Sequence, residues 1–124
     1  NSNADQIAQA TAKDYVLLTR LAHACCASEN VQFLNFFQPC LSWGDKPTTS
    51  VEKEYIANSP AMGGIQQKFK EQVLSQALPN YFHDLSGVFD RVTRQVYVDT
   101  GHLNPYGNFL VAEKIADQLA TKLS

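Results

Sequence analysis

The pattern in this sequence best suited to chemistry is an aspartate and a histidine three residues apart, Asp99 and His102. They follow a short apolar segment, residues 95–98, and precede Asn104-Pro105, which is a helix-start signal. In so tight a loop, the carboxylate can accept a hydrogen bond from one imidazole nitrogen and leave the other nitrogen free. Acyl transfer needs such a pair, because the imidazole takes a proton from the nucleophile and the carboxylate fixes the imidazole tautomer.

The same two residues also have a purely structural interpretation, in which Asp99 caps the turn and His102 is a surface histidine. The remaining histidines are less informative. His23 falls on an expected helix and is interpreted as a residue at the solvent edge. His83-Asp84 would form a metal site with Asp99 or His102 only if a further ligand were present.

Composition narrows the class of protein. The chain has 124 residues and a formal net charge of −2, which indicates one domain and argues against nucleic acid as a partner. Hydrophobic residues make up 44% and charged residues 18%, so the chain can bury a core. No apolar run approaches the roughly 18 to 20 residues that span a bilayer. The compartment stays open.

The cysteines do not indicate a disulfide scaffold or a zinc site. Cys25 and Cys26 are adjacent, which fits disulfide geometry poorly, and Cys40 stands apart. The odd count and the missing C-x₂-C spacing argue against a disulfide framework and against zinc. We expect buried thiols that behave as small hydrophobic side chains.

Hydrophobic spacing and helix signals predict an alternating order of elements. In the first helix, apolar residues at three- and four-residue steps predict a buried face made of Ile7, Thr11, Tyr15, Leu18, Leu21, Ala22 and Cys25. A capping box, Thr49 with Glu52, begins the second helix, and Pro79 stops the third. The expected helices are 5–28, 50–58, 64–78 and 105–122, with Leu110, Val111, Ile115 and Leu119 buried in the last, and the expected strands are 31–38, 81–85 and 95–98.

This order is typical of an α/β fold. Residues 31–38 (VQFLNFFQ) are almost continuously apolar, as in a strand covered on both faces of a parallel sheet. Two or three strands are few for such a sheet, so we expect that part of the fold lies outside this chain. An open sheet edge would then favour a homo-oligomer or a complementing chain.

The segment D-x-x-H-L-N-P-Y-G-N-x-x-x-A, which begins at Asp99, closely resembles the last conserved block of the SGNH hydrolases, the GDSL-like esterases and lipases. An earlier stretch is similar to the strand and loop of those proteins through Phe37-Gln38-Pro39, Lys46-Pro47 and Glu52-Lys53. The resemblance covers residues 5–124 but only the carboxyl-terminal portion of an SGNH domain. Residues 1–4 look like the remnant of an expression tag.

The resemblance implies a three-layer, flavodoxin-like α/β/α fragment with a small, mostly parallel sheet. It also implies that His102 is the general base and Asp99 the orienting carboxylate of a Ser-His-Asp triad. The family's Gly-Asp-Ser block has no counterpart, because Gly44-Asp45 is followed by Lys46. No serine of the chain lies in a nucleophile elbow, and the family's oxyanion donors have no match.

We therefore expect the carboxyl-terminal part of an SGNH-type serine esterase. It would act on a small ester without metal or organic cofactor, its nucleophile lying elsewhere, so that the isolated chain would be inactive. Trp43 follows the first predicted strand and could line an acyl or sugar pocket. The alternative is a non-catalytic α/β module that self-associates or binds a partner.

Overall fold

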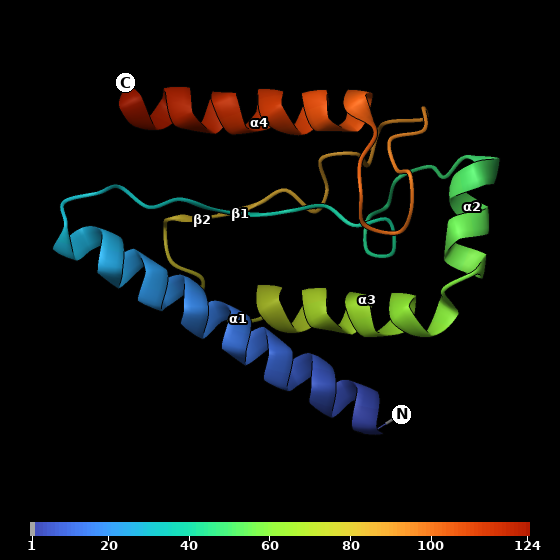
Figure 1. Ribbon diagram of the computed structural model, residues 1–124, viewed down its shortest axis with the longest axis horizontal. Helices are drawn as coiled ribbons and strands as arrows, with labels where there is room; N and C mark the ends of the chain where they lie inside the picture. Colours follow the sequence, from blue (N-terminus) through green and yellow to red (C-terminus); the bar gives the residue numbers. More distant parts are fainter. Residues whose placement is uncertain (1) are drawn as a thin grey trace. The chain divides into compact units, whose positions relative to one another are not determined.

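The computed structural model describes residues 2–124, except for the side chains of Ser2, Ala61 and Met62. The described chain is a mixed α/β protein with four helices and a two-stranded parallel sheet (Figure 1). In chain order the elements are α1 (Ser2–Ser28), β1 (Asn35–Phe37), α2 (Ser50–Ala57), α3 (Pro60–Leu74), β2 (Phe82–Asp84) and α4 (Pro105–Leu123).

The chain divides into two compact units, and both are built from two separate stretches of sequence. Unit 1 comprises Asn1–Phe37 and Ala61–His83, so it holds α1, α3 and β1. Unit 2 comprises Gln38–Pro60 and Asp84–Ser124, so it holds α2 and α4. The candidate catalytic residues Asp99 and His102 both lie in unit 2.

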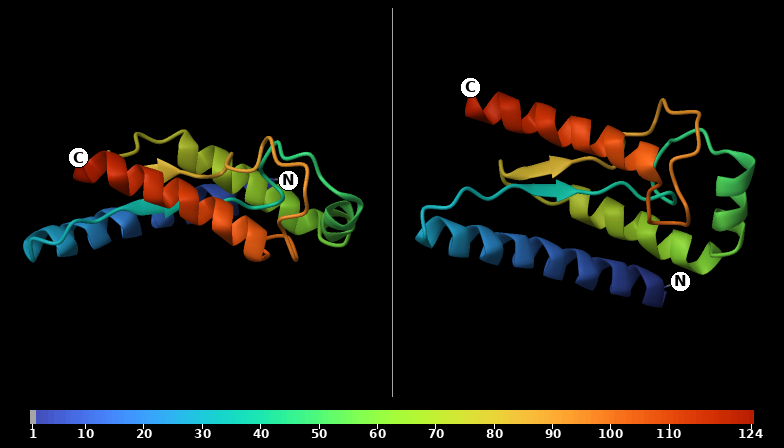
Figure 2. Two further views of the ribbon diagram at one scale, coloured as in Figure 1. Left: turned by 90° about the horizontal axis from the view of Figure 1, so that it is seen from above. Right: turned by 45° about the horizontal axis from the view of Figure 1, so that its top comes forward.

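In unit 1, α1 and α3 lie side by side, as Figures 1 and 2 show from several directions. Asp5 of α1 forms an ion pair with Lys68 of α3. Aromatic rings fill the space between the helices and the strands: Tyr15 contacts Phe69 edge-on at 5.8 Å between centroids, and Phe37 lies 5.7 Å from Phe82. These packed rings give unit 1 a core of its own.

The predicted buried face of α1 is wrong. The buried residues of this helix are Ala8, Ala12, Val16 and Thr19, whereas Ile7, Leu18 and Leu21 are exposed. The predicted and the observed buried residues both recur at steps of three and four, so periodicity alone does not show which face of α1 is buried. The side chains of the alanines are small enough to let α3 and its one aromatic residue, Phe69, approach the α1 backbone.

The sheet is shorter than predicted. β1 covers only the last part of the expected strand 31–38, and Val31 is exposed. The Asn35 N–H donates to the Tyr81 carbonyl at 2.8 Å, which joins β1 to the segment leading into β2. Within the described chain, each strand has a strand partner on one side only. In the expected strand 31–38, strand geometry is therefore limited to the residues that pair with β2.

Unit 2 is built around a cluster of buried side chains: Leu41, Phe89, Val96 and Tyr97. Phe89 and Tyr97 meet edge-on at 5.6 Å between ring centroids. Partly buried residues of α4, including Leu110 and Val111, pack against this cluster, while Leu119 near the end of the helix is exposed. The core therefore holds the first half of α4 more firmly than its end.

The helix starts in unit 2 follow the sequence signals. The Thr49 hydroxyl accepts a hydrogen bond from the Glu52 N–H, and the Glu52 carboxylate accepts one from the Thr49 N–H, so the predicted capping box is confirmed. Asn104 caps α4 by accepting from the Gly107 N–H, and Pro105 stands at the start of that helix. In unit 1, α3 begins at Pro60 and ends at Leu74, four residues earlier at each end than expected.

Residues 95–98 do not form the predicted strand. Tyr97 makes a single antiparallel bridge with Leu103. The N–H groups of Val96 and Tyr97 donate to the Glu52 carboxylate instead of to a neighbouring strand. A side chain thus satisfies the backbone groups that a sheet would otherwise pair. Among the described helices, none has the length and apolar character needed to cross a membrane.

Candidate active site

Asp99 and His102 are hydrogen-bonded to each other. The His102 Nδ1 lies 2.7 Å from the Asp99 Oδ2, and the other carboxylate oxygen, Oδ1, accepts from the backbone N–H groups of Gly101 and His102 at 2.8 and 2.7 Å. The carboxylate therefore closes the turn and binds the imidazole at the same time. Asp99 therefore has both of the roles considered from the sequence: it caps the turn, and it binds the imidazole.

The turn holds Asp99 in its ionised form. Hydrogen bonds from the backbone N–H groups of His102 and Gly101, together with the His102 side chain, lower the pKa of Asp99 to about 2. An ionised carboxylate only accepts hydrogen bonds, so the neutral imidazole donates through Nδ1–H and keeps its Nε2 lone pair available. The His102 side chain is 84% exposed, which leaves that nitrogen accessible.

The backbone around the turn is fixed on two sides. The Val98 N–H donates to the His102 carbonyl at 3.0 Å, which ties the two ends of the turn together. The Thr100 carbonyl accepts from the Leu41 N–H and from the Cys40 thiol, both at 3.0 Å. The loop that follows β1 therefore holds the tip of the Asp99–His102 turn in place through these two hydrogen bonds.

A buried ion pair anchors the segment before the turn. The Lys46 ammonium lies 2.7 Å from the Glu52 Oε2, and these side chains are only 3% and 0% exposed. The other oxygen, Oε1, accepts from the N–H groups of Val96 and Tyr97 at 3.0 and 3.3 Å. Since Asp99 comes two residues after Tyr97, the Glu52 carboxylate holds the backbone that leads to it.

Hydrogen bonding keeps the Glu52 carboxylate charged in spite of its burial. Burial alone would raise the pKa of Glu52. The hydrogen bonds from Lys46 and from the N–H groups of Thr49, Val96 and Tyr97 outweigh this effect and lower its pKa below the ordinary value. Burial also raises the pKa of the Tyr97 phenol, and the nearby Cys40, Glu52 and Asp90 raise it further, so this side chain stays neutral.

A cavity of about 370 Å³ lies next to the imidazole. Its lining comes from the turn, from the start of α4 and from the Gln38-Pro39 segment: Gln38, Pro39, Gly101, His102, Leu103, Asn108 and Val111. None of these lining residues carries a hydroxyl or a thiol. The cavity thus places an exposed imidazole beside a space for a small molecule, and its described lining provides no serine, threonine or cysteine.

Other residues noted in the sequence do not contribute to this cavity. Trp43 is buried and is not among the lining residues. His83 stacks on Phe36 at 5.2 Å, and Asp84 accepts from the Ser86 N–H. No group of three or more metal-ligating side chains occurs within the part of the chain that the structure describes.

The cysteines differ in their surroundings. Cys25 is exposed and Cys26 half-buried, contrary to the buried thiols expected, whereas Cys40 is buried and donates to Thr100. None of the three is part of a disulfide. Only Cys40 therefore contributes to the candidate site, through the backbone of the turn.

Sequence reasoning missed the anchoring role of Glu52. The capping box explains the contact of this residue with Thr49. It does not explain the hydrogen bonds from Val96 and Tyr97, which lie 44 and 45 positions further along the chain. The one available signal was Lys46, six residues earlier, which is a candidate ion-pair partner. No protein-family model, curated protein or solved structure matches this chain.

Proposed function

We propose that this chain supplies the general base and the orienting carboxylate of an SGNH-type serine ester hydrolase, with the nucleophilic serine provided from outside residues 1–124. The observation that carries the proposal is the 2.7 Å hydrogen bond between Asp99 and the Nδ1 of an exposed His102 beside a cavity. Because Asp99 binds Nδ1, the other nitrogen, Nε2, is left to act as a base, as the Ser-His-Asp mechanism needs.

In the proposed reaction, the His102 Nε2 takes the proton of a serine hydroxyl while the serine oxygen bonds to the ester carbonyl carbon. Asp99 remains ionised and stabilises the imidazolium that forms. The bond to the leaving alcohol then breaks, and Nε2 returns the proton to the departing oxygen. Water repeats the same steps to release the acid. The proposal includes no metal and no organic cofactor.

The resemblance to SGNH hydrolases also supports a finer proposal about the fold. In a three-layer, flavodoxin-like α/β/α domain, the two strands β1 and β2 would be part of a larger parallel sheet. Each of them has a strand neighbour on one side only within the described residues. Further strands would extend this sheet, and the Gly-Asp-Ser block would come from a segment outside residues 1–124.

The proposal is tested by hydrolysis of p-nitrophenyl acetate. We expect little turnover from the chain alone, and turnover when it is supplied with an SGNH segment that contains the Gly-Asp-Ser block. In that complex, His102→Ala should remove nearly all activity and Asp99→Asn should reduce it heavily. Added imidazole should partly restore the His102→Ala complex, because the missing group is a base. Activity that is unchanged in both variants would contradict the assignment.

The alternative, a self-associating α/β module, is favoured by one observation. Leu17, Leu18 and Leu21 on α1 are all more than half exposed. If a second copy covers them, sedimentation should show a dimer that Leu18→Glu dissociates. A monomer at all concentrations would leave the hydrolase proposal as the better account.

A further inference from the structure

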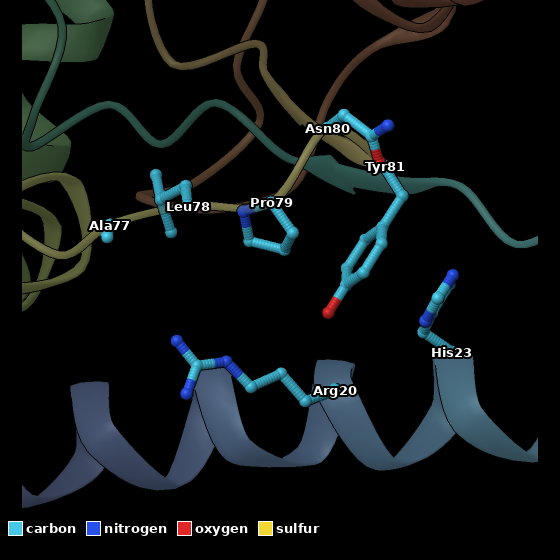
Figure 3. Close-up of a pocket in the computed structure, with 7 residues that line it drawn as sticks. All are labelled: Arg20, His23, Ala77, Leu78, Pro79, Asn80 and Tyr81. Carbon is cyan, nitrogen blue, oxygen red and sulfur yellow. The ribbon is translucent and has the colours of Figure 1, made fainter.

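Unit 1 contains a second cavity, which shares no residue with the one beside His102. It has a volume of about 380 Å³ and lies between α1 and the segment that follows α3 (Figure 3). Its walls combine polar and apolar side chains: Arg20, His23, Ala77, Leu78, Pro79, Asn80 and Tyr81. No aspartate or glutamate is among these lining residues.

Tyr81 is held rigidly in the wall of this cavity. Its ring stacks on His23 with centroids 4.4 Å apart and meets Phe33 edge-on at 5.2 Å. Its backbone carbonyl accepts from the Asn35 N–H, which ties it to the start of β1. These contacts fix where the hydroxyl lies.

The Tyr81 hydroxyl is buried and has no hydrogen-bond partner among the described residues. The residue as a whole is only 5% exposed. In Figure 3 the ring extends toward α1, and its oxygen points into the space between Pro79 and Arg20. A buried hydroxyl without a partner is unfavourable, so it marks a place where a ligand atom can supply the missing interaction.

Arg20 provides the charge on the same side of the cavity. Its side chain is exposed, and within the described chain it has no ion-pair partner. A guanidinium presents parallel N–H donors that match the two oxygens of a carboxylate. The neighbouring side chains of Ala77, Leu78 and Pro79 offer an apolar wall to the rest of a ligand.

We infer that this cavity binds a small organic carboxylate, whose oxygens accept from the Arg20 guanidinium and the Tyr81 hydroxyl and whose apolar body lies against residues 77–79. The lining contains one arginine and no acidic residue, so its charge matches a ligand that carries a single negative charge. The long, flexible side chain of Arg20 can move to let a ligand oxygen reach the hydroxyl. The inference does not depend on the proposed hydrolase function.

The test is an NMR titration of the ¹⁵N-labelled chain with sodium benzoate, and with benzamide as a neutral probe of the same shape. Benzoate should shift the amide signals of Arg20, Asn80 and Tyr81 in a saturable way, and benzamide should not. Arg20→Gln and Tyr81→Phe should each weaken benzoate binding by about tenfold or more. Lys13→Gln removes an equal charge from α1 outside the cavity and should leave binding unchanged.

Stability of the free variant separates a binding role from a structural one. Because the hydroxyl has no partner among the residues that the structure describes, Tyr81→Phe should keep or raise the melting temperature while it loses benzoate affinity. Unchanged affinity in this variant would overturn the inference, as would equal binding of benzamide or the absence of a saturable shift. Inorganic phosphate that binds where benzoate does not would also overturn it, in favour of a phosphate site.

Discussion

The Lys46 ammonium and the Glu52 carboxylate form an ion pair, 2.7 Å apart, inside unit 2, and almost no part of either side chain is exposed. The pair is also connected to the backbone, because Glu52 accepts from the N–H groups of Val96 and Tyr97. It joins the start of α2 to the segment that carries Asp99. The candidate catalytic turn therefore depends on two residues that do not touch it.

Glu52→Gln should destabilise unit 2 by about 3–5 kcal/mol, because it leaves the buried Lys46 ammonium without an opposite charge. Urea denaturation measures this loss. Glu54→Gln is the matched control, since Glu54 lies on the same helix and is exposed; it should change stability by less than about 0.5 kcal/mol. Equal effects of the two substitutions would show that the buried charge pair does not stabilise the fold.

The stability of the protein should fall as the solution is acidified. The pKa of Glu52 is lower in the folded chain than its ordinary value of 4.5, so near and below that pH the unfolded state binds more protons. The contribution of Glu52 is present above pH 4.5 and is lost as the pH falls toward its folded pKa. Asp99, with a pKa lowered from 3.8 to about 2, acts in the same direction at lower pH.

Urea midpoints measured between neutral and acidic pH test this dependence. The slope below pH 4.5 should be shallower in Glu52→Gln, whose side chain does not titrate. A stability that rises on acidification, or an identical slope in the variant, would contradict the assigned direction of the Glu52 pKa.

Asp99→Asn should change the tautomer of His102. The carboxylate only accepts, so it selects Nδ1–H, whereas an asparagine amide can donate to Nδ1 and favour the Nε2–H tautomer. Long-range ¹⁵N NMR of the neutral imidazole distinguishes the two forms without any measurement of activity. Asp45→Asn, at an exposed aspartate of the same unit, should leave the ring signals unchanged. Identical ring signals in Asp99→Asn and the parent chain would refute the orienting role.

Gly107→Ala should destabilise the chain by about 1–3 kcal/mol, because a methyl group there has no room. A Cβ atom at this position would lie 2.8 Å from the Val96 carbonyl oxygen and 3.1 Å from the Val96 Cβ. Gly64→Ala is the matched control within a helix, since nothing lies within 4 Å of its Cβ position. Alanine at position 64 should raise stability by up to about 1 kcal/mol. Thermal melts of both variants provide the comparison, and a neutral Gly107→Ala would contradict the packing.

Local chemistry made part of the structure predictable from the sequence. The Thr49–Glu52 capping box, the Asn104 cap and the contact between Asp99 and His102 each involve residues close together in the chain. Residue type and spacing are enough to predict such contacts, although distant residues also hold the backbone before Asp99. The short β1 and β2 strands also fall within the segments expected to form strands.

Features that depend on distant partners were not predictable. The buried face of α1 depends on α3 and its phenylalanine, which sequence spacing does not reveal. Residues 95–98 have the composition of a strand, but the N–H groups of Val96 and Tyr97 donate hydrogen bonds to the Glu52 carboxylate and not to a strand. The unpartnered hydroxyl of Tyr81 becomes visible only when its neighbours are placed around it.

The sequence separation between Glu52 and its two backbone donors has a kinetic consequence. Val96 and Tyr97 lie 44 and 45 residues after Glu52. The chain must therefore close a long loop before the segment leading to Asp99 can adopt its folded conformation. The amide hydrogens of Val96 and Tyr97 should therefore exchange with solvent only when unit 2 opens as a whole. The backbone that leads to Asp99 would then reach its folded conformation together with the rest of unit 2.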